Sequence, residues 1–263
     1  MDFLSAVLLA FIEGLTEFLP VSSTGHMILA SSLMKLENTE FLKTFEIVIQ
    51  LGAILAMLML YIKRFLVSWN IYMKLLVAFL PSGVMGFLAY KTIKTYLFNP
   101  VSVSAALIIG GVILIVLDKW TEEKKSKYEK AEDISYRDAI KIGFFQCLSM
   151  IPGVSRAAAT ILGGIFSGFD RKLATEFSFL LAIPTMFAAS GLDLFQSREN
   201  IHSDDIFLLL ASAGIAFSFA MIAVKAFIAI VQVFGFKYFG YYRIVLGALF
   251  LFFSYKMGLS LVP

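Results

Sequence analysis

Long, uninterrupted apolar runs constrain the fold of this chain more than any other feature of its sequence. A helix needs about 20 apolar residues to cross a bilayer, whereas a strand of a membrane barrel needs about 10 residues in strict alternation. The runs here are continuous, so we expect them to form membrane-spanning helices. The six candidates lie at about 45–62, 75–90, 101–117, 177–195, 206–224 and 244–259.

The composition supports a membrane protein and excludes several other classes. Hydrophobic residues make up 59% of the chain and charged residues 16%, and the mean hydropathy is +0.85. These values exclude an ordinary water-soluble globule and a disordered chain. The formal net charge is only +3, and no basic stripe stands apart from the apolar runs, which excludes a nucleic-acid binder.

Two further apolar segments, 2–34 and 139–168, are interrupted near the middle. The interruptions, at 20–25 and 152–156, are rich in Pro, Ser and Gly. Proline and glycine end helices, and backbone groups freed at membrane depth must be buried in protein or line a wet cavity. Each segment is therefore predicted to be a re-entrant helix pair.

The two interrupted segments resemble each other when the numbering is shifted by 133, so that Glu13 corresponds to Gln146 and Ser22 to Ser155. Further matches follow in the same order, which predicts two repeats, each a re-entrant pair plus three transmembrane helices. We expect an all-α integral membrane protein with a single membrane domain over 1–263. It comprises repeat one (about 1–117), a cytoplasmic loop (about 118–138) and repeat two (about 139–263).

Because each repeat has an odd number of spans, the second repeat enters the membrane from the opposite side, and the repeats are inverted in topology. The positive-inside rule places the segments rich in Lys and Arg in the cytoplasm. The two interruptions then approach each other near the midplane, where we expect a site. The segments assigned to the cytoplasm are 63–74, 119–141, 171–172 and 225–243.

Glu13 and Glu17 in the first interrupted segment lie one helical turn apart. Their carboxylates share a helix face and repel each other unless a cation or a proton lies between them. Carboxylate oxygens suit a hard divalent cation, so the pair is a candidate site for Mg²⁺ or Ca²⁺. A proton relay and a structural pair are the alternatives. For Glu46 and Glu176, at the starts of spans, we expect a structural role.

Arg156 lies at the end of the second interruption, where backbone N–H groups are freed and a helix N-terminus points inward. Its guanidinium, these amides and the hydroxyls of Ser155 and Thr160 describe a phosphate-binding site. The alternative is that Arg156 pairs with a glutamate and only holds two helices together.

The first interruption offers Ser22, Ser23 and His26 to the same site. A hydroxyl and an imidazole suit the roles of nucleophile and base, or of base and orienting group. Together with a metal ion and an arginine, they provide what phosphoryl transfer needs. The alternative for His26 is packing or a structural hydrogen bond.

These residues lie in two motifs that resemble the signature motifs of the undecaprenyl-diphosphate phosphatase family, also called the bacitracin-resistance protein family. The motifs are Glu-Gly-Leu-Thr-Glu-Phe-Leu-Pro-Val-Ser-Ser-Thr-Gly-His at 13–26 and Pro-Gly-Val-Ser-Arg-Ala-Ala-Ala-Thr at 152–160. The stretch 176–184 is similar to the family as well. The resemblance implies a membrane enzyme that removes the terminal phosphate from a polyprenyl diphosphate lipid, built as an interlocked inverted repeat with re-entrant helices.

The resemblance also implies a multi-pass protein of the cell membrane with its site on the outer side. The family commonly has Ser after the motif arginine, where this chain has Ala157, so one hydroxyl for phosphate is missing. Individual roles follow by position: metal binding or acid–base catalysis for Glu13 and Glu17, attack by Ser23 or His26 unless water attacks, and diphosphate binding by Ser155, Arg156 and Thr160.

A transporter or flippase of polyprenyl phosphate is the alternative function. Inverted repeats that meet at a midplane anion site are also typical of secondary transporters. Release of phosphate separates the two. The sequence leaves open the length of the lipid tail, the preferred divalent ion and the oligomeric state, a homodimer included.

Overall fold

The computed structural model describes residues 1–65, 69–97, 99–121, 126–198 and 201–257, and for 90–95 and 257 it describes the backbone only. Within these residues the regular structure is helical and no β-strand occurs, so the chain is all-α, as predicted. The helices are α1 (Phe3–Thr16), α2 (Ser23–Leu33), α3 (Glu40–Phe65), α4 (Trp69–Leu97), α5 (Pro100–Thr121), α6 (Tyr136–Cys147), α7 (Arg156–Phe166), α8 (Arg171–Ser197), α9 (Ile206–Phe234) and α10 (Lys237–Met257).

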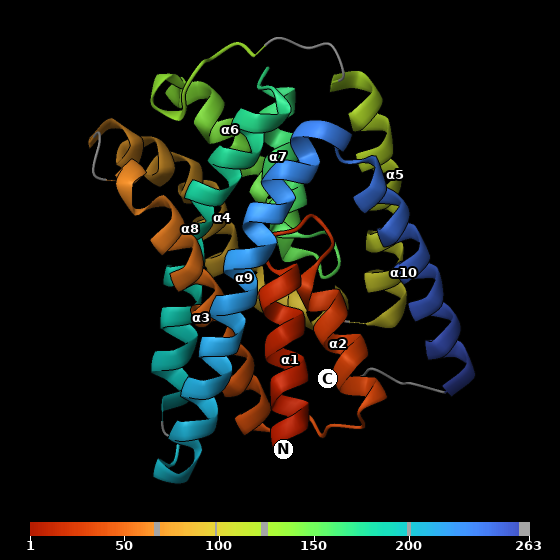
Figure 1. Ribbon diagram of the computed structural model, residues 1–263. Helices are drawn as coiled ribbons and strands as arrows, with labels where there is room; N and C mark the ends of the chain where they lie inside the picture. The colour runs from red at the N-terminus through yellow and green to blue at the C-terminus, as the bar shows by residue number, and fades with distance from the viewer. Residues whose placement is uncertain (66–68, 98, 122–125, 199–200, 258–263) are drawn as a thin grey trace.

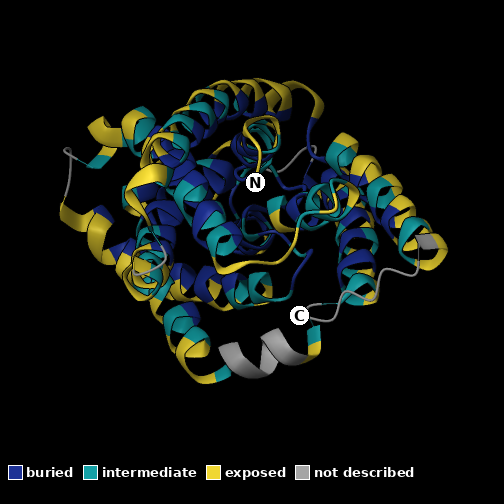
Figure 2. Ribbon diagram, turned by 90° about the horizontal axis from the view of Figure 1, so that it is seen from below, coloured by how far each residue is buried: buried dark blue, intermediate teal, exposed yellow. Residues whose placement is uncertain are grey.

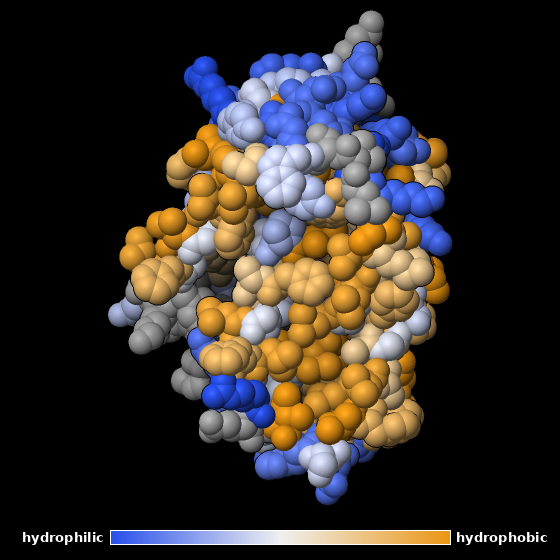
Figure 3. Space-filling model, turned by 90° about the vertical axis from the view of Figure 1, so that its left-hand side faces the viewer, coloured by the Kyte–Doolittle hydropathy of each residue, from blue (hydrophilic) through white to orange (hydrophobic). Residues whose placement is uncertain are grey.

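The surface has the polarity of a membrane protein. On the face shown in Figure 3, an apolar belt lies between two more polar ends. Seen from below, exposed residues cover the outer sides of the helices and buried residues lie between them (Figure 2). Among the described residues, six helical segments are long and apolar enough to cross a membrane, which confirms the predicted number of spans. They are Glu40–Phe65, Trp69–Ala89, Pro100–Thr121, Arg171–Ser197, Ser203–Phe234 and Lys237–Lys256.

The segment 225–243, expected to lie in the cytoplasm between two spans, is mostly helical, because α9 continues through Phe234 and α10 already begins at Lys237. The expectation rested on the basic residues in this segment. Lys225, however, is exposed on the outer edge of α9, and Arg243 is buried. A long basic side chain is compatible with a helix when its charge reaches the surface or finds internal acceptors. Parts of the predicted loop 118–138, of the sixth span and of repeat two, namely 122–125, 199–200 and 258–263, lie outside the described residues.

Side chains at the first turns fix where several helices begin. Asp2 accepts a hydrogen bond from the backbone N–H of Ser5 at the start of α1, and Asp170 accepts one from Leu173 at the start of α8. Such an acceptor satisfies a donor that the first turn of a helix leaves free. Local polar signals therefore set these helix ends, in addition to the apolar runs.

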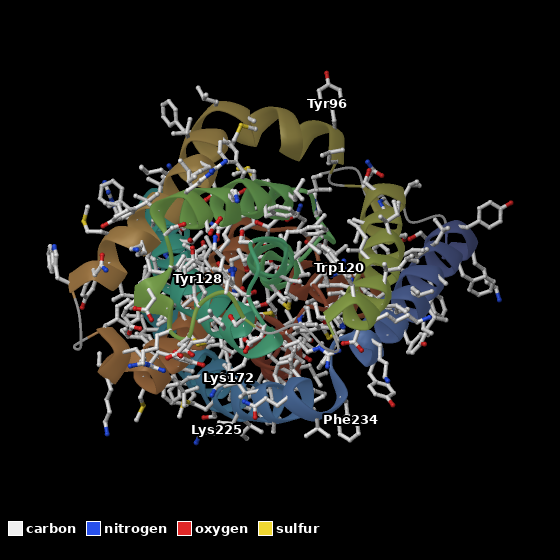
Figure 4. The ribbon with its side chains drawn as sticks, turned by 90° about the horizontal axis from the view of Figure 1, so that it is seen from above. Tyr96, Trp120, Tyr128, Lys172, Lys225 and Phe234 are labelled. Atoms are coloured by element: carbon white, nitrogen blue, oxygen red, sulfur yellow. The ribbon has the colours of Figure 1, made fainter. Side chains whose placement is uncertain are left out.

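The short helices α1 and α2 lie at one end of the molecule and α6 and α7 at the other, with their connecting segments between them (Figure 1). Helix α9 packs along α1, and α4 packs along α6. Seen from above, Lys225 and Phe234 mark α9 at one outer edge, and Tyr96 projects from α4 at the opposite edge (Figure 4). Helices α5 and α10 approach closely, since a Cβ on Gly111 or Gly240 would lie 2.6 Å from the carbonyl oxygen of the other.

The carboxylate of Asp138, near the start of α6, anchors the loop that precedes this helix. It accepts hydrogen bonds of 2.8 to 3.1 Å from Lys127, Tyr128, Ser135 and Lys141. Burial alone would raise the pKa of this carboxyl group, but the four hydrogen bonds hold it well below its ordinary value of 3.8. The ionised form is therefore favoured in the folded protein.

We expect replacement of this carboxylate to destabilise the protein in a pH-dependent way. Because the pKa of Asp138 is lower in the folded state, the ionised group stabilises the fold above its ordinary pKa, and this stabilisation is lost as the pH falls. Asp138→Asn is expected to lower the melting temperature of the detergent-purified protein at about pH 7, with a smaller difference below about pH 4. A difference that stays constant across this range would contradict the assignment.

Candidate active site

The two breaks in the short helix pairs meet inside the protein. They lie at 17–22, between α1 and α2, and at 148–155, between α6 and α7. Ser155 Oγ in the second break donates a hydrogen bond of 3.4 Å to the carbonyl oxygen of Leu19 in the first. The connecting segments lie beside each other in Figure 1, and this contact joins the two segments that carry the predicted site residues.

Ser22 and Ser155 share an unusual backbone conformation, with φ of 71° and 73°. Each caps the helix that follows its break, and each hydroxyl accepts a 3.3 Å hydrogen bond from the backbone N–H three residues on, at Gly25 and Ala158. Left-handed φ is strained for a residue other than glycine, and such strain is typical of functional sites. Helices α2 and α7 thus both begin at the meeting point, where their first N–H groups suit an anion.

Glu17 connects the two predicted halves of the site. Ser23 Oγ donates a short hydrogen bond of 2.5 Å to Glu17 Oε2, and Arg156 Nη2 lies 3.6 Å from Glu17 Oε1. A hydroxyl that donates to a carboxylate is arranged for activation as a nucleophile. The alternative considered for Arg156, pairing with a glutamate, is thus also present in the structure.

Arg156 is largely buried, yet its guanidinium is only partly satisfied. Nη1 donates to the carbonyl oxygen of Ser178 at 3.3 Å, but Nε and Nη2 have no hydrogen-bond partner among the described residues. The 3.6 Å separation from Glu17 is too long for a hydrogen bond. Because buried N–H groups are normally satisfied, this guanidinium needs a further acceptor, and a phosphate oxygen fits.

Glu13 and Glu17 are both buried, and the helical geometry of α1 continues to Glu17, so the two carboxyl groups lie on the same face. The carboxyl group of Glu46, on α3, is an electrostatic neighbour of Glu13. The described residues hold no group of three or more Asp, Glu, His or Cys side chains arranged to hold a metal ion. Two carboxylates still fit Mg²⁺, which commonly binds one or two carboxylates and takes its other oxygens from phosphates and water.

His26 makes hydrogen bonds through both ring nitrogens, and neither involves Ser23. Nδ1 lies 2.8 Å from the carbonyl oxygen of Ser22, and Nε2 lies 2.7 Å from the hydroxyl of Tyr242 on α10. The structure therefore brings Ser23 to Glu17 and His26 to Tyr242. The sequence analysis missed Tyr242, because a tyrosine at the edge of an apolar run is a common interfacial residue.

Thr160 is buried on α7, and its hydroxyl has partners inside the protein. Its Oγ1 atom donates to the carbonyl oxygen of Arg156 at 2.9 Å and lies 2.6 Å from Ser178 Oγ on α8. The contact with Ser178 joins α7 to α8 at the residue whose carbonyl oxygen also accepts from Arg156. The role of Thr160 in phosphate binding stays a prediction.

Arg243 on α10 joins both breaks, although it was not among the predicted site residues and lay in a segment assigned to the cytoplasm. Its fully buried side chain donates five hydrogen bonds of 2.8 to 3.3 Å, all to backbone carbonyl oxygens. A charge directly before an apolar run was the available signal, since charges inside a membrane protein usually serve a function. The acceptors are Pro20 in the first break, Gly153 and Val154 in the second, and Ala106 and Leu107 in α5.

Gly153 in the second break is expected to tolerate no side chain. Its φ is +92°, and a Cβ there would lie 2.6 Å from the carbonyl oxygen of Val103. We expect Gly153→Ala to destabilise the protein by at least about 1 kcal/mol and to lower activity, because it strains the segment that carries Arg156. Thermal unfolding of the purified variant measures this. A control is Gly191→Ala, where a Cβ would meet no atom within 4 Å, and equal effects of the two substitutions would contradict the prediction.

Comparison with known proteins identifies the family. The family model described as bacitracin resistance protein BacA matches residues 6–249. This chain belongs to that family. The BacA match includes both breaks and Arg243, so the resemblance inferred from the two motifs is confirmed.

Three curated relatives match nearly the whole of this chain, and each is named an undecaprenyl-diphosphatase. The protein from Wolinella succinogenes is 50% identical over 253 residues, which are 96% of this chain and 98% of the relative. The protein from Bdellovibrio bacteriovorus is 51% identical over 256 residues, 97% of each chain. The protein from Campylobacter fetus is 47% identical over 257 residues, 95% of this chain and 98% of the relative.

Proposed function

We propose that this chain is a membrane phosphatase that hydrolyses undecaprenyl diphosphate to undecaprenyl phosphate and inorganic phosphate. This reaction recycles a lipid carrier for cell-wall synthesis. The observation that carries the proposal is the 50% and 51% identity, over almost the full chain, to relatives named undecaprenyl-diphosphatase. The chemistry of the site agrees, because it combines a partly unsatisfied guanidinium with a hydroxyl–carboxylate pair.

In the proposed reaction, Ser23 attacks the terminal phosphorus. The bond between Ser23 Oγ and phosphorus forms while the hydroxyl proton passes to Glu17, and the bond from phosphorus to the bridging oxygen breaks, which releases undecaprenyl phosphate. Water then attacks the phosphoserine, inorganic phosphate leaves, and Glu17 returns its proton to Ser23. The 2.5 Å contact between Ser23 and Glu17 supports this route over attack by His26 or directly by water.

The diphosphate is proposed to bind between the two breaks. Arg156 offers its unpartnered Nε and Nη2 groups to the phosphate oxygens. Ser22, Ser155 and Thr160 are the proposed hydroxyl contacts, and the first N–H groups of α2 and α7 add backbone donors. The polyprenyl tail then lies among the apolar helices, where transfer from lipid gains little, so the head group carries most of the recognition.

Glu13 and Glu17 are the proposed holders of a divalent cation, Mg²⁺ or Ca²⁺. Such an ion supplies positive charge that neutralises the non-bridging oxygens of the diphosphate. Two buried carboxylates on one face of a helix are destabilised by mutual repulsion unless a cation or a proton lies between them, which supports this assignment.

The architecture is proposed to be an inverted repeat with two re-entrant helix pairs in the cell membrane. The matching φ values of Ser22 and Ser155 support it, as does the equivalent placement of α9 on α1 and of α4 on α6. With the segments richest in Lys and Arg in the cytoplasm, α1 and α2 enter from the outer side. The resemblance to the family favours a site that opens to this side.

The test is release of inorganic phosphate from a polyprenyl diphosphate by detergent-purified protein, with and without a chelator. Glu17→Ala is the inactive variant, and Glu37→Ala, at an exposed glutamate, is its control. We expect release that the chelator and Glu17→Ala both abolish and that Glu37→Ala leaves unchanged. Folded wild-type protein that binds polyprenyl phosphate but releases none would overturn the proposal in favour of transport.

A further inference from the structure

The hydrogen bonds of His26 define which of its ring nitrogens carries a proton. The carbonyl oxygen of Ser22 only accepts, so Nδ1 of His26 must be the donor in this bond. In the neutral imidazole Nε2 is then an acceptor, and the hydroxyl of Tyr242 donates to it. The lone pair of Nε2, through which the ring acts as a base, therefore accepts the hydrogen bond from the Tyr242 phenol.

In this arrangement His26 does not bond to the hydroxyl of Ser23, which the sequence offered as its partner. Ser23 donates to Glu17, and Tyr242 takes the position at Nε2. The two rings lie nearly parallel, at an angle of 7° with their centroids 5.6 Å apart. His26 therefore exchanges a proton with a reacting group only through the oxygen of Tyr242.

The backbone at Tyr242 is held in place by the next residue, Arg243, while the ring of Tyr242 stays partly exposed. Arg243 follows directly and is held by hydrogen bonds to Pro20 in the first break and to Gly153 and Val154 in the second. Tyr242 itself is 48% exposed. His26, to which the phenol is hydrogen-bonded, lies three residues after Ser23 in α2 and therefore on the same face of that helix, which brings the phenol toward the nucleophile.

We propose, building on the phosphatase activity proposed above, that Tyr242 positions His26 and relays protons between its Nε2 atom and the water that attacks the phosphoserine. As the new oxygen–phosphorus bond forms, water gives a proton to the Tyr242 oxygen and the phenol proton passes to Nε2. The bond from phosphorus to Ser23 Oγ breaks, Ser23 regains its proton from Glu17, and the imidazolium afterwards returns its proton to solvent.

The test compares four variants in the phosphate-release assay: Tyr242→Phe, His26→Asn, the double substitution, and Tyr241→Phe as the matched control. Tyr241 is the adjacent residue on α10 and is 53% exposed. We expect Tyr242→Phe to lower kcat by at least about a hundredfold, the lower end of the range of general acid–base effects, while KM is unchanged. The double variant is expected to lose no more than His26→Asn alone, because the two groups act in one path.

Several outcomes overturn the relay. Wild-type kcat in Tyr242→Phe, losses that add in the double variant, an equal loss in Tyr241→Phe, or a change in KM alone would each do so. Thermal unfolding of each variant shows whether a loss of kcat follows from loss of structure, and a kcat loss that only tracks unfolding also overturns the relay. Wild-type protein that releases no phosphate would instead overturn the proposed function.

Discussion

Arg156→Ala is expected to lower kcat/KM for phosphate release by about a thousandfold, the loss seen when a preorganised donor to a developing negative charge is removed. The reason is the state of its guanidinium, which is buried and keeps Nε and Nη2 without partners among the described residues. In the proposed complex, the diphosphate satisfies those donors. Alanine removes them and the charge together. The measurement is steady-state phosphate release with a polyprenyl diphosphate.

Arg156→Lys separates phosphate binding from a structural ion pair. An ammonium group keeps the charge that faces Glu17, but it loses the planar fork that binds two phosphate oxygens. We expect Arg156→Lys to melt close to wild type and to recover little activity. Arg198→Ala, at an exposed arginine, is the control. Near-wild-type release by either Arg156 variant would contradict the phosphate-binding role and leave only the pairing with Glu17.

The sequence predicted the elements whose cause is local. Apolar runs long enough to cross a bilayer gave six spans because lipid leaves the backbone no other partner than its own helix. Proline and glycine at 20–25 and 152–156 gave breaks because they interrupt helical hydrogen bonds. The structure has a helix end or start at each break, and the side chains of Glu17, Ser23 and Arg156 meet there.

The parts of the site that sequence did not predict depend on contacts between distant segments. Arg243 lies far along the chain from both breaks and was assigned to the cytoplasm, because its charge was weighed without its carbonyl acceptors. Tyr242 has the appearance of an interfacial residue in the sequence, and its contact with His26 joins residues 216 positions apart. The partner of Ser23 also could not be chosen from spacing, since Glu17 and His26 lie on opposite sides of it in sequence and both are within reach.

Replacing Arg243 is expected to remove both stability and activity. Methionine at this position leaves the carbonyl oxygens of Pro20, Gly153 and Val154 in the two breaks without this donor, and each buried group left unsatisfied costs about 1–3 kcal/mol. Arg243→Met is therefore expected to yield little folded protein. In Arg243→Lys the ammonium group has only three N–H donors for the five carbonyl oxygens that Arg243 contacts. We therefore expect an intermediate melting temperature and low activity. A lysine variant that matches wild type in both would contradict the assigned role.

A milder substitution tests the same contact in a protein that keeps Arg243. Gly110 on α5 lies against the guanidinium, and a Cβ there would overlap Nη2 of Arg243. Gly110→Ala is expected to displace this group, weaken its bonds to Ala106 and Gly153, and lower phosphate release more than it lowers the melting temperature. Gly191→Ala adds the same methyl group to α8 where no atom lies within 4 Å, so we expect it to change neither. If Gly110→Ala matches Gly191→Ala, the second break is held by contacts other than Arg243. If it loses activity while staying folded, Arg243 acts on the reaction through the position of the two breaks.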